Sequence, residues 1–115
     1  MQADLAKALR QFAEERNWEQ FHTPKNIAMA LSVESAELLE IFQWLTPDQS
    51  QSLSGEQHQR VKEEVGDVMN YLVRLCDVLD IDLLDSAWSK LASNREKYPA
   101  DRVRGSAAKY TEYDK

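Results

Sequence analysis

Hydrophobic positions recur every three or four residues along most of this chain, which is the spacing of amphipathic helices. The pattern predicts four helices, over residues 4–17, 24–44, 56–79 and from about 83 to just before Pro99. Thr23 followed by Pro24 predicts the start of the second helix, because Thr caps helix N-termini and Pro suits the first helical position. No stretch of useful length alternates as a strand would. We therefore expect an all-α, four-helix bundle-like subunit.

The segments between the predicted helices lack helical periodicity and are predicted to be loops or turns. Residues 18–22 have no clean period, and Thr46-Pro47 followed by the polar DQSQSLSGEQ predicts a loop. Asp82, with Asp85 three residues later, resembles an acidic capping box that starts the fourth helix, whose apolar residues we expect to face the core. Residues 99–115 are polar and aperiodic, which predicts an extended arm on a partner or a partly disordered tail. We expect residues 1–115 to form a single domain.

Charge and composition exclude several classes of partner. Twenty acidic against fourteen basic residues give a net charge of -6, which argues against binding of polymeric nucleic acid. One cysteine, no secretory pattern at the N-terminus and no membrane-length apolar run predict a cytoplasmic protein without membrane attachment. Long apolar stripes in so short a chain also favour oligomerisation.

Acidic residues interrupt the apolar stripes of the second and third helices. At about 100° per residue, Glu34 falls within the stripe of its helix and Glu37 lies at its edge, whereas Glu40 points elsewhere. Glu64 and Asp67 occupy the matching edge of the third helix, whose Glu63 faces solvent. Two ExxE/D pairs, each one turn apart, would bring four carboxylates together if the helices pack antiparallel.

Four carboxylates in a poorly hydrated cleft require a cation or protons to offset desolvation and mutual repulsion. Oxygen ligands without cysteine or converging histidine select Mg²⁺, or Mn²⁺, and leave positions for substrate phosphates. Two alternatives stay open. Lys or Arg could pair with the acids in a non-catalytic helical adaptor. A di-iron bundle would need Glu-x-x-His on two helices, and the chain has only Glu19-x-x-His22, in an aperiodic stretch.

With these acidic pairs the chain resembles the MazG-like all-α nucleoside triphosphate pyrophosphohydrolases, in particular their dCTP pyrophosphatase branch. The similarity extends over FAEERNWEQFHTPKNIAMALSVESAELLEIFQW, EEVGDVMNYLV, SKLASNREKYP and RGSAAKYT, which together span most of the chain. The resemblance implies Mg²⁺-dependent hydrolysis of a dNTP to its monophosphate and pyrophosphate, in nucleotide-pool control or clean-up, by a homotetramer built as a dimer of dimers.

The resemblance also assigns roles to residues at matching positions. Glu34, Glu37, Glu64 and Asp67 match the metal ligands or the base that positions water, and Glu37 is our choice of base. A second set matches substrate-binding positions: Trp18, His22 and Trp44 around the pyrimidine, Tyr71 in the pocket, and Lys90 and Asn94 toward the triphosphate. Lys97 shares the helical stripe of Lys90 and Asn94, so we expect it to face phosphate oxygens as well.

Read without the resemblance, Trp44 fits a core position equally well and the Lys face a solvated surface. Departures at Ser35, Ala36 and Gly66, and the chain's own sequence at residues 47–55, leave open the choice among dCTP, modified cytosine nucleotides and other dNTPs.

Overall fold

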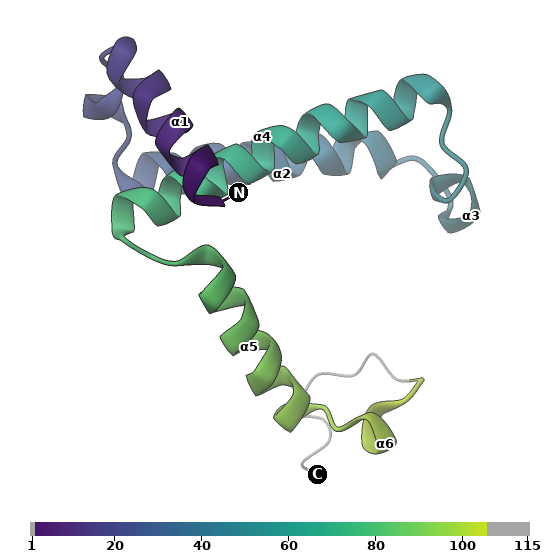
Figure 1. Ribbon diagram of the computed structural model, residues 1–115. Coiled ribbons are helices and arrows are strands. Elements are labelled where there is room, and N and C mark those ends of the chain that lie inside the picture. The colour runs from purple at the N-terminus through teal and green to yellow at the C-terminus, as the bar shows by residue number, and fades with distance from the viewer. Residues whose placement is uncertain (1, 106–115) are drawn as a thin grey trace. The chain divides into compact units, whose positions relative to one another are not determined.

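A computed structural model describes residues 2–105, and all regular structure within this range is helical. This confirms the all-α prediction. The elements, shown in Figure 1, are α1 (Gln2–Glu15), the 3₁₀ turn η1 (Glu19–Phe21), α2 (Pro24–Phe42), α3 (Pro47–Ser50), α4 (Gly55–Leu79), α5 (Leu83–Lys97) and α6 (Ala100–Val103). The chain forms two compact units, the first ending at Ile81 and the second beginning at Asp82. None of the described helices is long and apolar enough to cross a membrane.

The first unit is built on a hairpin of α2 and α4. The two helices lie side by side, and the chain turns between them through α3 (Figure 1), so they run in opposite directions. α1 packs on α4 as well. The most buried apolar side chains come from all three helices: Ala13 on α1, Ile27 and Ile41 on α2, and Val73 and Cys76 on α4. This packing fixes which edges of α2 and α4 face each other.

Capping residues set the starts of the long helices. Thr23 accepts a hydrogen bond from the Asn26 backbone N–H at 3.2 Å, so α2 starts where the Thr-Pro pair predicts. Ser54 and Gln57 form a reciprocal capping box, which starts α4 at Gly55, one residue before the predicted start. The caps satisfy backbone donors that the first turn leaves without intrahelical partners.

One helical turn lies inside the segment predicted to be a loop. Thr46 and Gln49 form a second capping box, and Pro47 occupies the first position of α3. The polar composition of this segment led to the loop prediction, although the capping box and the Pro at the first position are sufficient to start one helical turn. α2 ends at Phe42, two residues before the predicted end at Trp44.

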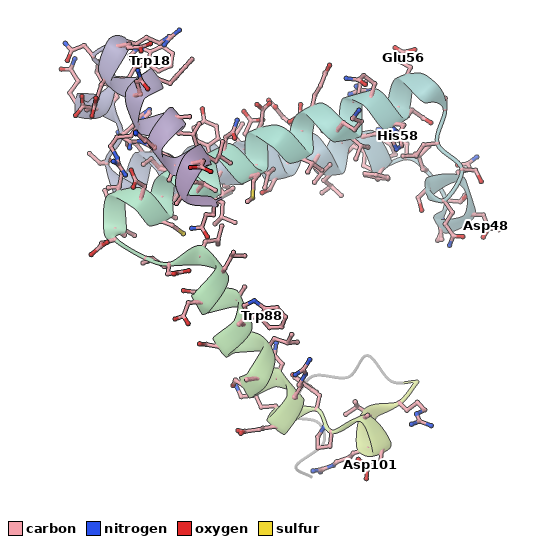
Figure 2. All side chains as sticks on the ribbon, viewed as in Figure 1. Trp18, Asp48, Glu56, His58, Trp88 and Asp101 are labelled. Atoms are coloured by element: carbon pink, nitrogen blue, oxygen red, sulfur yellow. The ribbon has the colours of Figure 1, made fainter. Side chains whose placement is uncertain are left out.

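Up to residue 105, where the described range ends, the second unit contains α5 and α6. Asp82 accepts from the Asp85 backbone N–H at 2.9 Å, as the Asp82/Asp85 spacing predicts. The apolar side chains of α5 do not form a core within their own unit: Leu84, Trp88 (Figure 2) and Leu91 are 40–66% exposed. A single helix with one further turn is too small to cover them. Residues 100–103 form a turn of helix in the predicted tail, and residues 106–115 lie outside the described range.

We predict that Ser54→Ala lowers the free energy of unfolding of the protein by about 0.5–2 kcal/mol, because it removes the α4 cap. Urea unfolding followed by circular dichroism measures the change. Ser52→Ala, in the exposed segment just before the cap, is the matched control and should leave the midpoint unchanged. Equal midpoint shifts for the two variants would contradict the role given to the cap.

Candidate functional site

Three glutamates converge where α2 faces α4. Glu34 and Glu37 lie one turn apart on α2, and Glu64 approaches from α4. One carboxylate oxygen from each residue lies within 4.8 Å of the other two. Glu34 Oε2 and Glu64 Oε2 are buried and have no hydrogen-bond partner among the described residues. The α2–α4 packing therefore gathers carboxylate oxygens without satisfying them.

The electrostatics of this cluster are unfavourable when every group is charged. Burial, the hydrogen bonds that Glu34 can make to Glu37 and Glu64 only when it is protonated, and the charges of Glu37 and Asp67 raise the pKa of Glu34 to about 7. A proton shared between neighbouring carboxyl groups relieves part of this repulsion. Among the described residues no Lys or Arg forms an ion pair with the three glutamates. The alternative in which basic side chains neutralise the acids thus finds no support in this part of the chain.

The donor set fits a hard divalent cation. All converging ligand atoms are carboxylate oxygens, two of them buried and unpartnered. Mg²⁺ and Mn²⁺ prefer oxygen ligands, and Mg²⁺ is usually held by a few carboxylates while substrate phosphates or waters fill its remaining positions. Glu34, Glu37 and Glu64 could hold such an ion.

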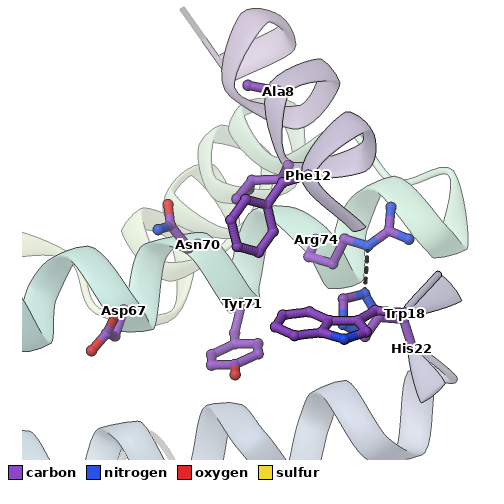
Figure 3. A pocket seen from close by; sticks show the side chains of 9 residues that line it. Ala8, Phe12, Trp18, His22, Asp67, Asn70, Tyr71 and Arg74 are labelled. Atoms are coloured by element: carbon purple, nitrogen blue, oxygen red, sulfur yellow. Dashed lines mark hydrogen bonds between the residues drawn. The ribbon is translucent and has the colours of Figure 1, made fainter. Parts of the chain in front are cut away.

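Asp67 links this cluster to a pocket. It is exposed and is not one of the three converging residues, but its charge acts on Glu34. Its side chain lines a pocket of about 410 Å³ (Figure 3), together with Ala8, Leu9, Phe12, Trp18, His22, Asn70, Tyr71 and Arg74. A ligand bound in the pocket would therefore have the acidic cluster at one side.

Aromatic rings form much of the pocket wall. The Phe12 and Trp18 rings meet edge to face, with centroids 5.6 Å apart and an interplanar angle of 70°. The Trp18 and His22 centroids are 6.5 Å apart, and Tyr71 stands beside them in Figure 3. Such surfaces suit a flat heterocyclic ligand, because offset and edge contacts with aromatic rings are favourable.

A series of linked hydrogen bonds between charged side chains holds His22, at the wall of the pocket. Arg74 is 8% exposed, and it donates from Nε to His22 Nδ1 at 3.0 Å and from Nη1 to Asp77 Oδ2 at 3.2 Å. Arg10 on α1 also donates to both Asp77 oxygens, at 2.6 and 3.0 Å. Arg10 above all, and then Arg74, lower the pKa of Asp77. Burial, and then the charge of Arg74, lower the pKa of His22.

The structure brings together seven of the eleven residues predicted for the site. Glu34, Glu37 and Glu64 form the cluster, and Trp18, His22, Asp67 and Tyr71 line the pocket. Trp44 follows the end of α2, is 86% exposed and does not line this pocket. Lys90, Asn94 and Lys97 lie on α5, in the second unit. The substrate-binding roles of these four residues stay predictions.

Five residues that line the pocket were missed from the sequence: Ala8, Leu9, Phe12, Asn70 and Arg74. Asn70 and Arg74 continue, at steps of three and four, the edge of α4 that carries Asp67. Extending the helical wheel two turns beyond Asp67 would have found them.

The all-α fold, with a carboxylate cluster that could hold a metal ion beside an aromatic pocket, defines a class of helical proteins with a candidate metal site, and the comparisons identify the family. The MazG-like family model matches residues 29–113, so the chain belongs to the MazG-like family. It is 42% identical over 111 residues to dCTP pyrophosphatase 1 of Homo sapiens, and 40% identical over 111 residues to that of Mus musculus. Each alignment covers 95% of this chain but 65% of the relative, so the chain spans just under two thirds of their length.

Among solved structures, the chain is similar to the crystal structure of a pyrophosphatase from Archaeoglobus fulgidus. The TM-score is 0.80 and the sequence identity 42%, and the match covers 84% of this chain and 91% of that one. The likeness extends to nearly the whole archaeal chain.

We predict that metal-free protein loses stability as pH rises from about 4.5 to about 7. In that window the folded state holds a proton on Glu34 that the unfolded state releases, so the free energy of unfolding falls with rising pH. In the wild type we expect the free energy of unfolding to fall by about 1–3 kcal/mol over this window, a range reduced to allow for the partial exposure of Glu34. Glu34→Gln should abolish this fall. Urea unfolding of both proteins in EDTA at several pH values gives the difference.

Glu40→Gln, at an exposed position two turns along α2, is the matched control and should follow the wild-type curve. Because His22 has a lowered pKa, it contributes an opposite slope below its ordinary value of 6.5, and this contribution cancels when variants are compared. Parallel curves for wild type and Glu34→Gln would contradict the clustering of charge at Glu34.

Proposed function

We propose that this chain is a Mg²⁺-dependent nucleotide pyrophosphohydrolase that cleaves a dNTP, with dCTP or a modified cytosine dNTP preferred, to the monophosphate and pyrophosphate. The observation that carries the proposal is the acidic cluster, whose two buried oxygens have no partner among the described residues, beside an aromatic pocket. The names of the relatives support it, since they are dCTP pyrophosphatases and a pyrophosphatase.

Glu34, Glu37 and Glu64 would hold the cation, with Asp67 on the side of the pocket. Bound Mg²⁺, for which Mn²⁺ could substitute, would neutralise the triphosphate and the charge that develops on the leaving pyrophosphate. The same ion would offset the repulsion that raises the pKa of Glu34. A chain with a net charge of -6 can therefore accept a polyanionic substrate.

Side chains of the protein would bind the base and accept the proton of the attacking water. Trp18 and Tyr71 offer aromatic surface to the base, next to the acidic side of the pocket. Glu37 would accept a proton from the attacking water as the new P–O bond forms and the phosphoanhydride bond to pyrophosphate breaks. No covalent enzyme intermediate is needed.

The remaining predicted substrate contacts enter the proposal through the family resemblance, except Lys97, which shares the helical stripe of Lys90 and Asn94. Trp44 would add to the base contacts, and Lys90, Asn94 and Lys97 would contact phosphate oxygens. We also propose that the chain assembles as a homotetramer. Five apolar residues on α2 and α4 remain 40–57% exposed and support an assembly that buries them: Met29, Val33, Val65, Met69 and Leu79.

The test is to incubate purified protein with each dNTP and Mg²⁺ and to separate the products. We expect dCMP and pyrophosphate from dCTP, and no turnover in EDTA. Diphosphate plus inorganic phosphate would contradict the proposed bond cleavage. An absence of product from dCTP, modified cytosine dNTPs and the other dNTPs would favour the non-catalytic adaptor.

We predict that Glu64→Gln lowers kcat by at least about 100-fold, while the melting temperature of the metal-free protein holds or rises. The substitution removes a metal ligand but also relieves repulsion in the cluster. Glu63→Gln, the neighbouring exposed position on α4, is the control and should retain activity. A large loss of thermal stability in Glu64→Gln would instead indicate a structural ion pair.

A further inference from the structure

Arg74 is the buried arginine that the proposed chemistry leaves without a role. It belongs to α4, while its partner His22 ends the η1 turn 52 residues earlier in the chain. Both line the pocket, and Figure 3 shows the hydrogen bond between them behind the Trp18 ring. A charged side chain that is 8% exposed at the wall of a binding pocket calls for a physical explanation.

The Arg74–His22 hydrogen bond determines the chemistry of the imidazole. A guanidinium stays protonated and can only donate, so His22 Nδ1 must accept and carries no proton. A neutral imidazole then holds its proton on Nε2. His22 is thus left with one polar atom for a ligand, an N–H donor.

Arg74 is itself held in place. Its Nη1 donates to Asp77, and Asp77 also accepts two hydrogen bonds from Arg10. The low pKa of Asp77 keeps this carboxylate charged. The guanidinium therefore faces His22 before any ligand arrives, and no reorganisation is needed on binding.

We propose that Arg74 is a positioning residue that fixes His22 as a neutral imidazole with its proton on Nε2. His22 Nε2–H would then donate a hydrogen bond to an acceptor atom of the bound base. This inference rests on the proposed function and adds a residue to it. In this proposal Arg74 acts through its hydrogen bond to His22. Asp77 and Arg10 contribute only by orienting Arg74.

The charges around His22 agree with a neutral ring. Arg74 and Asp77 come from α4, and Arg10 from α1 is paired with Asp77. Asp67 lines the same pocket, and Glu19, in the η1 turn, is exposed. Burial and the charge of Arg74 both lower the pKa of His22, so the imidazolium form is disfavoured twice.

The first test is NMR of ¹⁵N-histidine protein, comparing wild type with Arg74→Met. The chain has two histidines, and the exposed His58 on α4 serves as the internal reference. In the wild type we expect His22 with an unprotonated Nδ1 and a protonated Nε2. In Arg74→Met the His22 titration should move to higher pH and its ring-nitrogen shifts should change, while those of His58 stay the same.

The second test is a double-mutant cycle in steady-state kinetics with dCTP. Arg74→Met should raise KM about 3- to 10-fold through the lost hydrogen bond, with kcat within about twofold. Arg74→Lys, which keeps a cationic donor, should recover part of the loss. In a His22→Ala background, Arg74→Met should change KM by less than about twofold, because coupled residues are not additive.

Folding should survive the substitution, because Asp77 keeps both hydrogen bonds from Arg10 when Arg74 is replaced. Arg60→Met, an exposed arginine on the same helix, is the matched control and should leave KM and the His22 signals unchanged.

Two results would overturn the proposal: a His22 titration identical in wild type and Arg74→Met, or a KM effect of Arg74→Met that persists without His22. A protein that turns over no nucleotide would remove the proposed function, while the NMR comparison would still decide whether Arg74 fixes His22.

Discussion

The packing of α2 against α4 is the constraint on which the candidate site depends. The apolar residues that the hairpin buries, Ile27, Ile41 and Val73, force the opposed edges of the two helices together. Glu34 and Glu64 lie on those edges, so their carboxylates are held close whatever their mutual repulsion. Hydrophobic burial thus maintains an arrangement that electrostatics alone would disperse, and a proton or a hard cation relieves it.

One edge of α4 organises the site from its acidic end to its basic end. Glu64, Asp67, Tyr71 and Arg74 follow one another at steps of three, four and three residues, so they share one side of the helix over about 15 Å. Glu64 belongs to the acidic cluster, and Asp67, Tyr71 and Arg74 line the pocket. Under the proposed function, phosphates lie toward Glu64 and the base lies toward Arg74.

Sequence reasoning succeeded where the information is local or periodic. The start of α2 follows from Thr23 and Pro24, and the convergence of the glutamates follows from helical spacing and an antiparallel hairpin. It failed at α3, although Thr46 and Gln49 carry a visible capping box. The Arg74–His22 contact could not be predicted, because it depends on how the η1 turn folds back onto α4, which no periodicity encodes.

The distribution of the arginines explains why the acidic cluster stays available to a cation. Among the described residues, Arg10 and Arg74 both pair with Asp77, one residue from the most buried part of α4, and leave the three glutamates unpaired. A guanidinium at Glu64 would have satisfied its buried oxygen and removed the need for a metal. Both arginines are engaged at Asp77, about 20 Å along the same helix from Glu64, so their positive charge lies at the end of α4 that contacts His22. The separation of charge along α4 therefore gives one helix two distinct ends: Glu64 joins a carboxylate cluster that could hold a cation, and Arg74 holds His22 of the neighbouring η1 turn.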